Sequence, residues 1–407
     1  MALGERVVQL IRAQGPIPFD RFMEMALYSE GGFYSFPNQV GSRGHFYTSP
    51  SAHPLFGALL ALEWEEMWNL LGQPSPFWVV EVGSGSGGLA RDILSFARHL
   101  EPAFSQALAY LTIDRGWPAR VELARGHLRA KGIPLRSLTG VIFSNELLDS
   151  LPVHRVTQQG GAVKEIYVAL DGEEWVELLG EPSTPLLGEY LDEVGIHLEE
   201  GQRAEIRLGM GPWMEEAARV LVRGYVITID YGHLASELYS PLRFNGTLAC
   251  YYRHTVSHDP YRHPGLQDIT AHVDFTAAIL AGERCGLTAL GLTTQRQFLR
   301  NLGLHAFIEA LPRLGLRPSV LRANQMALQN LWRPDGLGDF KVLVQGKGVP
   351  TEELDGLNPS SPHQSLSLAS PPGLAVPLLH EEHIPLLAGR YPHLAWDEAE
   401  FGLGGEA

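Results

Sequence analysis

The sequence predicts a doubly wound α/β fold, in which helices cover both faces of a mostly parallel sheet. Short apolar runs of the kind buried in parallel sheets recur between residues 77 and 145. Helical periods separate these runs, which gives the β-α-β alternation of this fold class. A glycine-rich turn follows the first run, where such folds bind their ligands. The 407 residues suffice for one such core with additional segments.

Residues 1–75 are expected to form a helical region before the sheet, because apolar residues recur there at helical spacing. Val7, Leu10 and Ile11 would share one helical face. The segment from Gly31 to Pro50 is rich in glycine and aromatic residues. It is expected either to cover a ligand as a lid or to pack as a compact Ω loop.

The first half of the sheet is expected within residues 77–145. A strand at 77–82 precedes the glycines, and a helix follows from Leu89. A second strand is expected at 109–114, a second helix at 117–131 and a further strand at 140–144.

The remaining chain is expected to complete a core over residues 76–347. Residues 155–210 and 233–300 are expected as insertions on the substrate side of that core. The other expected core elements are a helix at 213–223 and strands at 225–230 and 340–345. Proline and serine enrichment predicts a linker and a C-terminal appendage over residues 348–407.

Composition narrows the classes of function. A net charge of −15 argues against a nucleic-acid partner, which needs clustered lysine and arginine. Two cysteines exclude a disulfide framework and a thiolate metal site. The absence of an uncharged apolar run of about 18 residues argues against a membrane span. The N-terminus lacks a signal-peptide pattern, so a cytoplasmic location is expected.

The sixteen histidines raise the question of a metal site. Their densest group is His254, His258, His263 and His272, in a stretch broken by proline and glycine. No HExxH motif is present. Structural or surface roles are therefore expected for this group, and no metal is predicted.

The glycine-rich turn matches two fingerprints. Gly83, Gly85 and Gly88 fit the GxGxxG of dinucleotide-binding folds, whereas Gly83, Gly85 and Gly87 fit the GxGxG of methyltransferases. Glu81 favours the second fingerprint, because a carboxylate can hold the cationic amino-acid end of S-adenosylmethionine but repels a pyrophosphate.

Asp114, at the end of the second expected strand, could accept both ribose hydroxyls of an adenosine. That role fits either cofactor and does not choose between them. The alternative for Asp114 is a helix cap.

The run from Asn145 to His154, NELLDSLPVH, resembles the NE-(L/F)-(L/F)-DALPVH motif of the MidA-like family. Further segments resemble family motifs in the same order: Ala26–Tyr28 with Gly31–Tyr34, Phe46–Pro50 with Phe56–Gly57, Ile229–Gly232, Gly246–Leu248, Asp268–Phe275, and Thr294–Gln295 with Phe298–Leu299. The resemblance covers about residues 5–346. It implies a Rossmann-like class I methyltransferase that uses S-adenosyl-L-methionine and methylates arginine of a protein, in a family connected with assembly of respiratory complex I.

Several positions depart from the family pattern. In the glycine turn, Ser84, Ser86 and Gly88 occupy the usual Pro, Arg and Thr positions. Two acids of the family are replaced by His45 and Ser51, and the ribose acid, usually Glu, is the shorter Asp114. Altered substrate choice or weakened catalysis is therefore a second expectation.

Glu146 is predicted to be the principal partner of a substrate guanidinium, with Asp149 in support and Asn145 orienting substrate or cofactor. These residues follow a strand at the carboxyl edge of the sheet, and a three-residue spacing would place both acids on one side of a helical turn. The alternative is that Asn145 caps a helix whose positive end the two acids favour.

The resemblance places Thr48, Ser49 and Pro50 at the cofactor. Secondary candidates are Asp230 and Tyr231, which end another strand at the same edge. A structural hydrogen bond is expected for His154. Asp268, His272 and Asp274 would either line the substrate side or form an internal polar network.

The expected function is a methyltransferase acting on a protein substrate, for which a respiratory complex I subunit is one candidate, and a homodimer is left open. Three alternatives remain: a methyltransferase for a small molecule, an assembly chaperone that binds S-adenosylmethionine without turnover, and a nicotinamide dehydrogenase. The dehydrogenase is disfavoured by Glu81 and by the NELLDSLP segment.

Overall fold

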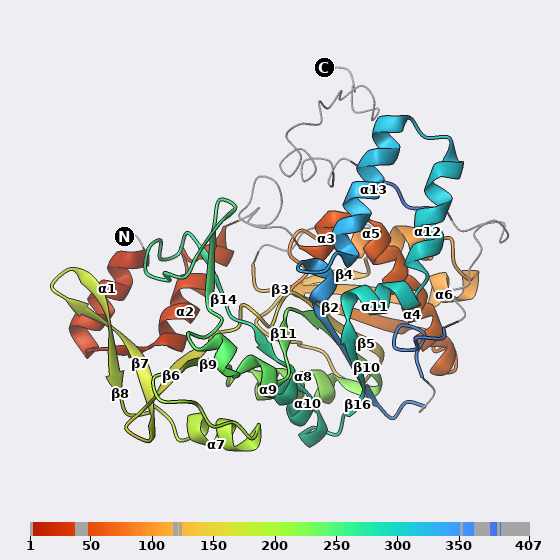
Figure 1. The fold of residues 1–407 in the computed structure, drawn as a ribbon. Helices are drawn as coiled ribbons and strands as arrows, with labels where there is room; N and C mark the ends of the chain where they lie inside the picture. Colours follow the sequence, from red (N-terminus) through yellow and green to blue (C-terminus); the bar gives the residue numbers. More distant parts are fainter. Residues whose placement is uncertain are drawn as a thin grey trace.

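The structure, a computed structural model, describes residues 3–36, 48–116, 121, 124–350, 353–361, 375–380 and 383. Figure 1 shows a lobe built on a central sheet beside a smaller lobe that contains the N-terminal helices. Among the described residues, no helix is both long and apolar enough to span a membrane.

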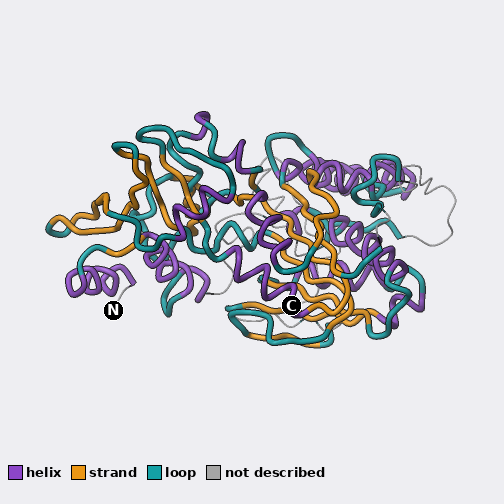
Figure 2. Tube along the Cα trace, turned by 90° about the horizontal axis from the view of Figure 1, so that it is seen from below, coloured by secondary structure: helices purple, strands orange, loops and turns teal. Residues whose placement is uncertain are grey.

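The central sheet has seven strands and confirms the doubly wound α/β prediction. Their order is β16 (Thr288–Thr294), β17 (Lys341–Lys347), β10 (Leu221–Asp230), β5 (Leu138–Asn145), β2 (Phe77–Val82), β3 (Leu108–Asp114) and β4 (Gly126–Arg129). The five strands from β10 to β4 are parallel, and β17 and β16 add antiparallel pairs at one edge. The strands run through the molecule as orange ribbons between purple helices in Figure 2.

Helices cover both faces of this sheet because its buried strands present apolar side chains to both sides. One face packs against α4 (Leu55–Leu70), α5 (Gly88–Ala97), α6 (Pro102–Ala107), α11 (Gln295–Asn301), α12 (Leu304–Ala310) and α13 (Pro318–Trp332). The other face packs against α8 (Met210–Val220) and α10 (Phe275–Arg284). Val79 and Val80, adjacent in β2, belong to the two different cores.

The helix expected at 117–131 is wrong for the part of that segment that the structure describes. Residues 126–129 form β4, which pairs in parallel with β3. Leu128 packs against the core under the sheet, and the other side chains of this edge strand stay partly exposed. Residues 117–120 and 122–123 lie outside the described residues.

The smaller lobe joins the N-terminal helices to the first insertion and to part of the second. The expected second insertion, 233–300, also contains α10 and β16, which belong to the sheet lobe. The elements of the smaller lobe are α1 (Leu3–Gln14), β1 (Ile17–Pro18), α2 (Phe19–Tyr28), β6 (His154–Gln159), β7 (Ala162–Asp171), β8 (Glu174–Gly180), α7 (Leu186–Glu193), β9 (Arg203–Ile206), β12 (Ala249–Tyr252), β13 (Thr255–Ser257) and β14 (Asp268–Thr270). Phe19 and Phe22 share a core with Val168 from the first insertion and Ile269 from the second. Residues expected as one N-terminal region are therefore divided, because α3 (Ser49–Ala52) and α4 belong to the sheet lobe.

Short elements connect the two lobes. They are β11 (Gly232–His233), α9 (Ala235–Leu238) and β15 (Val273–Asp274), with a 3-10 turn at Pro241–Arg243. Three other 3-10 turns of the described residues lie within the lobes: Phe33–Ser35 packs on α2 in the smaller lobe, and Leu311–Leu314 and Leu337–Asp339 flank α13 in the sheet lobe. β11 pairs in parallel with β15, directly after the end of β10. These connections carry the chain away from the carboxyl edge of the central sheet.

The described parts of the C-terminal segment pack on the sheet lobe. Leu354 is buried in the core beside α4, and the Gly356 N–H donates to Glu63 Oε2 at 3.0 Å. Leu379 packs against Ala323 and Ala327 of α13. The stretch expected as a linker and appendage therefore makes fixed contacts with the core at these points.

Candidate active site

The glycine loop, residues 83–87, lies where the strand order changes direction. β2 is flanked by β3 on one side and β5 on the other, and the crevice at the carboxyl ends of such neighbours is the usual ligand site of this fold. Gly83, Gly85 and Gly87 have φ angles of 79°, 50° and 73°, a region that strains any residue with a Cβ. Among the residues that the structure describes, no heavy atom lies within 4 Å of the position that a Cβ on Gly85 would take, so these residues leave the space above the loop open.

Glu81 is buried two residues before Gly83. The Tyr110 hydroxyl donates a hydrogen bond to Glu81 Oε2 at 2.9 Å. Burial raises the pKa of Glu81 to about 8, although the Tyr110 bond acts in the opposite direction. A cation above the glycine loop would favour the ionised form and bring this pKa down.

Asp114 ends β3 and faces the glycine loop. Its Oδ2 accepts from the Gly85 N–H at 2.9 Å, and its Oδ1 accepts from the Gly116 N–H at 2.7 Å. The structure thus brings Glu81, the glycines and Asp114 to one edge of the sheet. Their roles at a cofactor stay predictions.

Asn145 ends β5, beside the glycine loop. Its Nδ2 donates to Glu146 Oε1 at 3.0 Å. Its Oδ1 is buried and has no hydrogen-bond partner among the described residues. Because a buried acceptor without a donor is costly, this oxygen suits a donor group of a bound ligand.

Residues 146–150, here called the acid turn, follow β5. Glu146 Oε1 accepts from the Ser49 N–H at 2.8 Å, and the Glu146 N–H donates to the Ile229 carbonyl at 2.8 Å. A Cβ on Gly83 would lie 2.8 Å from Leu147 Cδ1, so the acid turn packs directly against the glycine loop.

The helical turn expected for Glu146 and Asp149 is wrong. Glu146 has a φ of 50°, and residues 146–153 contain no helix. Asp230 explains the difference, because its Oδ2 accepts from the N–H groups of Leu148 and Asp149 at 2.9 and 3.2 Å. A side chain from β10 therefore binds these backbone donors, and the helix cap proposed for Asn145 does not form.

Asp149 is buried within the acid turn. The Tyr231 hydroxyl donates to Asp149 Oδ2 at 2.7 Å, while Oδ1 has no hydrogen-bond partner in the part of the chain that is described. Burial raises the pKa of Asp149, although Tyr231 and Arg207 counteract it. Burial also raises the pKa of Asp230 well above its usual value, with Asp149 and Glu146 adding to the effect.

The smaller lobe adds aromatic residues and a further acid to this site. The Tyr34 hydroxyl donates to Asp268 Oδ1 at 3.0 Å, and Tyr28 donates to the Ser150 carbonyl at 2.9 Å. The rings of Tyr28 and Tyr34 are stacked, with centroids 5.4 Å apart. Burial, and then the charge of Asp149, raise the pKa of Asp268 to about 8.

Negative charge is therefore concentrated around the acid turn. Four carboxylates contribute to it: Glu146, Asp149, Asp230 and Asp268. Arg207 is one cation beside them, but its guanidinium donates to main-chain carbonyls, including those of Asp149 at 3.0 Å and Ala271 at 2.8 Å. Burial is the main cause of the raised pKa values of Asp149, Asp230 and Asp268, so a cation bound beside these acids would favour their ionised forms.

Three of these contributors were not predicted from the sequence as site residues: Tyr28, Tyr34 and Arg207. The two tyrosines lie in the N-terminal motif that resembles the family, and that match was the available signal. No local pattern marked Arg207, since it reaches the acid turn from 58 residues away.

The helix α3 begins at Ser49, with Thr48 as its N-cap and Pro50 in its first turn. The Ser49 N–H contacts the acid turn through Glu146. The Ser49 hydroxyl donates to Gln295 Oε1 at 3.0 Å, which ties α3 to α11. Thr48 and Ser51 form a local pair, with the Thr48 N–H donating to Ser51 Oγ at 2.9 Å. His45, and most of the expected lid, lie outside the described residues.

The remaining predicted site residues, Asp274, His272 and His154, make their side-chain contacts outside residues 146–150. Asp274 accepts from the Thr276 and Ala277 N–H groups and caps α10, which is a structural role. His272 stacks against His233, and burial lowers the pKa of His272 to about 4. His154 lies between Glu165 at 2.8 Å and Asp20 at 3.3 Å in the smaller lobe.

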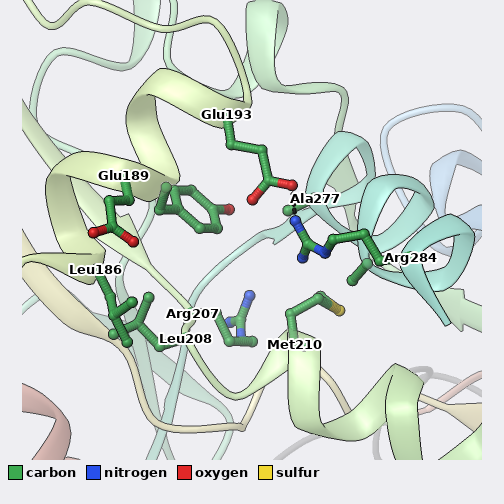
Figure 3. Close-up of a pocket in the computed structure, with 11 residues that line it drawn as sticks. Leu186, Glu189, Glu193, Arg207, Leu208, Met210, Ala277 and Arg284 are labelled. Carbon is green, nitrogen blue, oxygen red and sulfur yellow. Dashed lines mark ion pairs between the residues drawn. The ribbon is translucent and has the colours of Figure 1, made fainter.

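A cavity of about 290 Å³ lies away from this site, between α7, α8 and α10. Figure 3 shows Arg207 at one side of this cavity and the ion pair of Glu193 with Arg284 across it. No residue of the glycine loop or the acid turn lines it.

Residues 59–293 match a protein-family model described as "Putative S-adenosyl-L-methionine-dependent methyltransferase". This range runs from within α4 to within β16, and it contains the glycine loop and the acid turn.

Curated relatives and a solved structure match most of the chain. The mitochondrial protein arginine methyltransferase NDUFAF7 homolog of Drosophila melanogaster is 27% identical over 396 residues, covering 87% of each chain. Its Homo sapiens counterpart is 26% identical over 365 residues, covering 81% of this chain and 79% of the relative. A Burkholderia thailandensis protein solved with bound S-adenosyl-homocysteine is 31% identical, with a TM-score of 0.75 over 87% of this chain and 94% of that one.

These relatives also bear on location. The Drosophila, rat and human proteins are all named as mitochondrial. The cytoplasmic location expected from the N-terminal sequence is contradicted by them.

Proposed function

Since the chain belongs to a family of S-adenosyl-L-methionine-dependent methyltransferases, we propose that it methylates arginine side chains of a protein substrate. Methyltransferase activity and the cofactor, both expected from the motifs, are confirmed by this membership. The relatives from Drosophila and human, which are named as protein arginine methyltransferases, support the arginine assignment. The observation that carries it is the cluster of carboxylates around the acid turn.

The residues at the carboxyl edge fit S-adenosylmethionine. Open space above Gly85 leaves room for a ligand against the backbone. We assign Glu81 and the unpaired Asn145 Oδ1 to the cationic amino-acid end, and Asp114 to the ribose hydroxyls. Thr48, Ser49 and Pro50 would close the site from the side of α3.

A guanidinium suits the surplus of negative charge. It is a planar cation with five N–H donors, and carboxylates bind it with charge-assisted hydrogen bonds. Glu146 and Asp149 are the acids we assign to it, because they lie on the turn that packs against the glycine loop. Tyr28 and Tyr34 stack beside Asp268, and the guanidinium of Arg115 already lies 4.5 Å from the centroid of the Tyr28 ring. We therefore assign these rings to the wall of the site and not to the substrate guanidinium.

When bound, the cofactor supplies an electrophilic methyl group on a sulfonium. The protein must hold a poorly nucleophilic nitrogen in line with that group and must remove one proton as the N–C bond forms. Glu146 is fixed for this by Ser49 and Asn145, so its orientation does not depend on the substrate. Asp149 Oδ1, which has no partner in the described part of the site, is placed to take the proton.

Incubation of the purified protein with methyl-labelled cofactor and cell lysate tests this function. Label is expected in the protein fraction, and acid hydrolysis of that fraction should release methylarginine. Excess S-adenosyl-homocysteine should suppress the label. Label confined to small molecules would instead support the small-molecule alternative, and cofactor binding without any label would support the chaperone alternative.

Cofactor affinity is expected to rise with pH because Glu81 must ionise to hold a cation. With a pKa of about 8, ionised Glu81 increases roughly tenfold per pH unit below neutrality. Calorimetry between about pH 6 and about pH 7 should therefore show roughly tenfold tighter binding of S-adenosyl-homocysteine. The ligand-free protein should show the opposite trend, losing stability as pH rises from 4.5 towards 8, since the folded state holds the extra proton.

Two variants test whether Glu81 causes this pH dependence of cofactor binding. Glu81→Gln should remove the pH dependence of binding. Glu63→Gln is the matched control, because burial also raises the pKa of Glu63 well above its usual value but Glu63 contacts the C-terminal segment. If binding by Glu81→Gln still depended on pH in the same way, Glu81 would not be the residue that holds the cofactor.

The names of these relatives support a protein as the substrate, and they do not say which protein this chain would methylate. A respiratory complex I subunit as substrate follows only from the resemblance, and a homodimer stays an open expectation. We keep as proposals the core over residues 76–347 and the C-terminal segment over 348–407. The expected N-terminal region, residues 1–75, is divided between the lobes, since α3 and α4 pack on the sheet lobe.

A further inference from the structure

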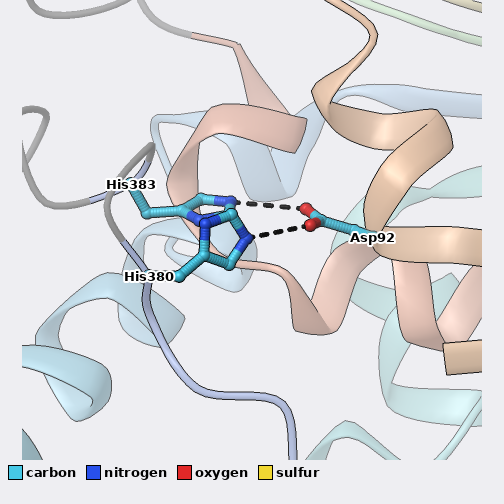
Figure 4. Close-up of side chains that lie close together, drawn as sticks. All are labelled: Asp92, His380 and His383. Carbon is cyan, nitrogen blue, oxygen red and sulfur yellow. Dashed lines mark hydrogen bonds and ion pairs between the residues drawn. The ribbon is translucent and has the colours of Figure 1, made fainter. Parts of the chain in front are cut away.

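Two histidines from the C-terminal segment converge on one buried carboxylate of α5. His380 Nε2 lies 3.1 Å from Asp92 Oδ1, and His383 Nε2 lies 3.3 Å from Asp92 Oδ2. Figure 4 shows both imidazoles directed at the two oxygens of Asp92. The side chains of Asp92 and His383 are only 4% and 5% exposed. The three residues are thus arranged around one small volume at the edge of the sheet lobe.

The histidines are held there by contacts of their own segment. The Leu379 N–H donates to Asn324 Oδ1 of α13 at 3.0 Å. Val376 and Leu378 pack against the main core, and Leu379 packs on α13. The approach of His380 to Asp92 therefore does not depend on the histidine contacts alone.

The two distances, 3.1 and 3.3 Å, are compatible with ligands that share one metal ion, and the shorter one also fits an ordinary hydrogen bond. Hydrogen bonds between an imidazolium and a carboxylate are usually about 2.7–2.9 Å long. Ligand atoms around tetrahedral Zn²⁺, with bonds of about 2.0–2.2 Å, lie roughly 3.3 Å from one another.

We propose that Asp92, His380 and His383 form a binding site for a transition-metal ion such as Zn²⁺. Imidazole nitrogens select Zn²⁺ over Mg²⁺ and Ca²⁺, which prefer oxygen ligands. Three protein ligands leave a fourth position for water. The neighbouring His53 is not part of this site, because its Nδ1 accepts from the Leu55 N–H and its Nε2 contacts Asn324 Oδ1.

The metal would fasten the C-terminal segment to the cofactor-binding half of the sheet. Asp92 lies five residues after Gly87, on the helix that begins at the glycine loop. His380 is 288 residues further along the chain. A bound ion would connect these distant segments and so stabilise the folded state over the unfolded one.

Metal analysis of the untagged full-length protein tests the site. After chelation and dialysis, the protein is equilibrated with Zn²⁺, freed of excess metal and measured by mass spectrometry. One equivalent of zinc is expected, with a higher melting temperature than the metal-free protein. Co²⁺ in place of zinc should give visible absorption from imidazole coordination.

The double variant His380→Ala, His383→Ala should lose the zinc and the rise in melting temperature. The matched control, His99→Ala with His197→Ala, removes two exposed histidines elsewhere and should keep both. Circular dichroism and S-adenosyl-homocysteine binding verify that the variants are folded. Zinc equal in both double variants, or none in the unmodified protein, would overturn the proposal and leave a hydrogen-bonded contact only.

Discussion

Replacing Gly85 by valine is expected to abolish cofactor binding, with affinity at least roughly 100-fold weaker, or about 2.7 kcal/mol. The φ of Gly85 is 50°, and its missing side chain faces open space above the glycine loop. A valine would strain the loop and place two methyl groups in the volume that we assign to S-adenosylmethionine. Calorimetry with S-adenosyl-homocysteine measures the effect directly.

Gly160→Val separates these two causes. Gly160 has a φ of 60°, and a Cβ there would also meet no atom within 4 Å, but it lies in the hairpin between β6 and β7 of the smaller lobe. A valine at residue 160 would therefore strain the backbone as it does at residue 85, but at a position away from the proposed cofactor site. Gly160→Val should bind the cofactor normally, and normal binding by Gly85→Val would refute the position of the cofactor.

Glu146→Gln is expected to slow methyl transfer by about 100-fold or more while cofactor affinity stays within about twofold. The amide keeps an oxygen for the Ser49 N–H but removes the charge that we assign to the substrate guanidinium. Single-turnover measurements with saturating labelled cofactor report this step without interference from product release.

A matched control comes from Glu200, whose Oε1 accepts from the Gly160 N–H at 2.7 Å in the smaller lobe. Glu200→Gln also neutralises a carboxylate bound to a backbone donor, and its rate of transfer should be unchanged. If Glu146→Gln turned over as fast as the unmodified protein, Glu146 would have no part in catalysis.

The sheet was predictable because its central strands are continuous apolar runs between glycine and polar residues. β2, β3, β5 and β10 were all expected at close to their observed positions. β4 was not, because residues 126–129 form a partly exposed edge strand with one inward-packed leucine, a pattern that resembles part of a helix. Local periodicity is weakest at edges, where tertiary pairing decides the structure.

The chemistry of the site was easier to predict than its geometry. The acids and glycines were identified from strand ends and from the family motifs, and the structure gathers them at one edge. The shape of the acid turn depends on Asp230, which lies 82 residues from Leu148, and no local rule includes that bond. The same holds for the histidines at 380 and 383, which meet Asp92 only in the folded chain.

Family membership could be predicted because long motifs recur in order, but location could not. The N-terminal composition supported a cytoplasmic expectation that the mitochondrial relatives contradict. Physical chemistry constrains which side chains can share a site. The location of a protein in the cell depends instead on its recognition by other molecules.

The hydrogen bond between Ser49 and Glu146 sets a lower limit on the size of the working enzyme. Ser49 precedes the family-matched range that begins at residue 59, and its other partner, Gln295, follows the end of that range at 293. A fragment trimmed to that range would keep its glycines and acids but would lose the group that aims Glu146. With the role that we propose for Glu146, the smallest catalytic unit is larger than the family-matched range, because it includes the flanking residues Ser49 and Gln295.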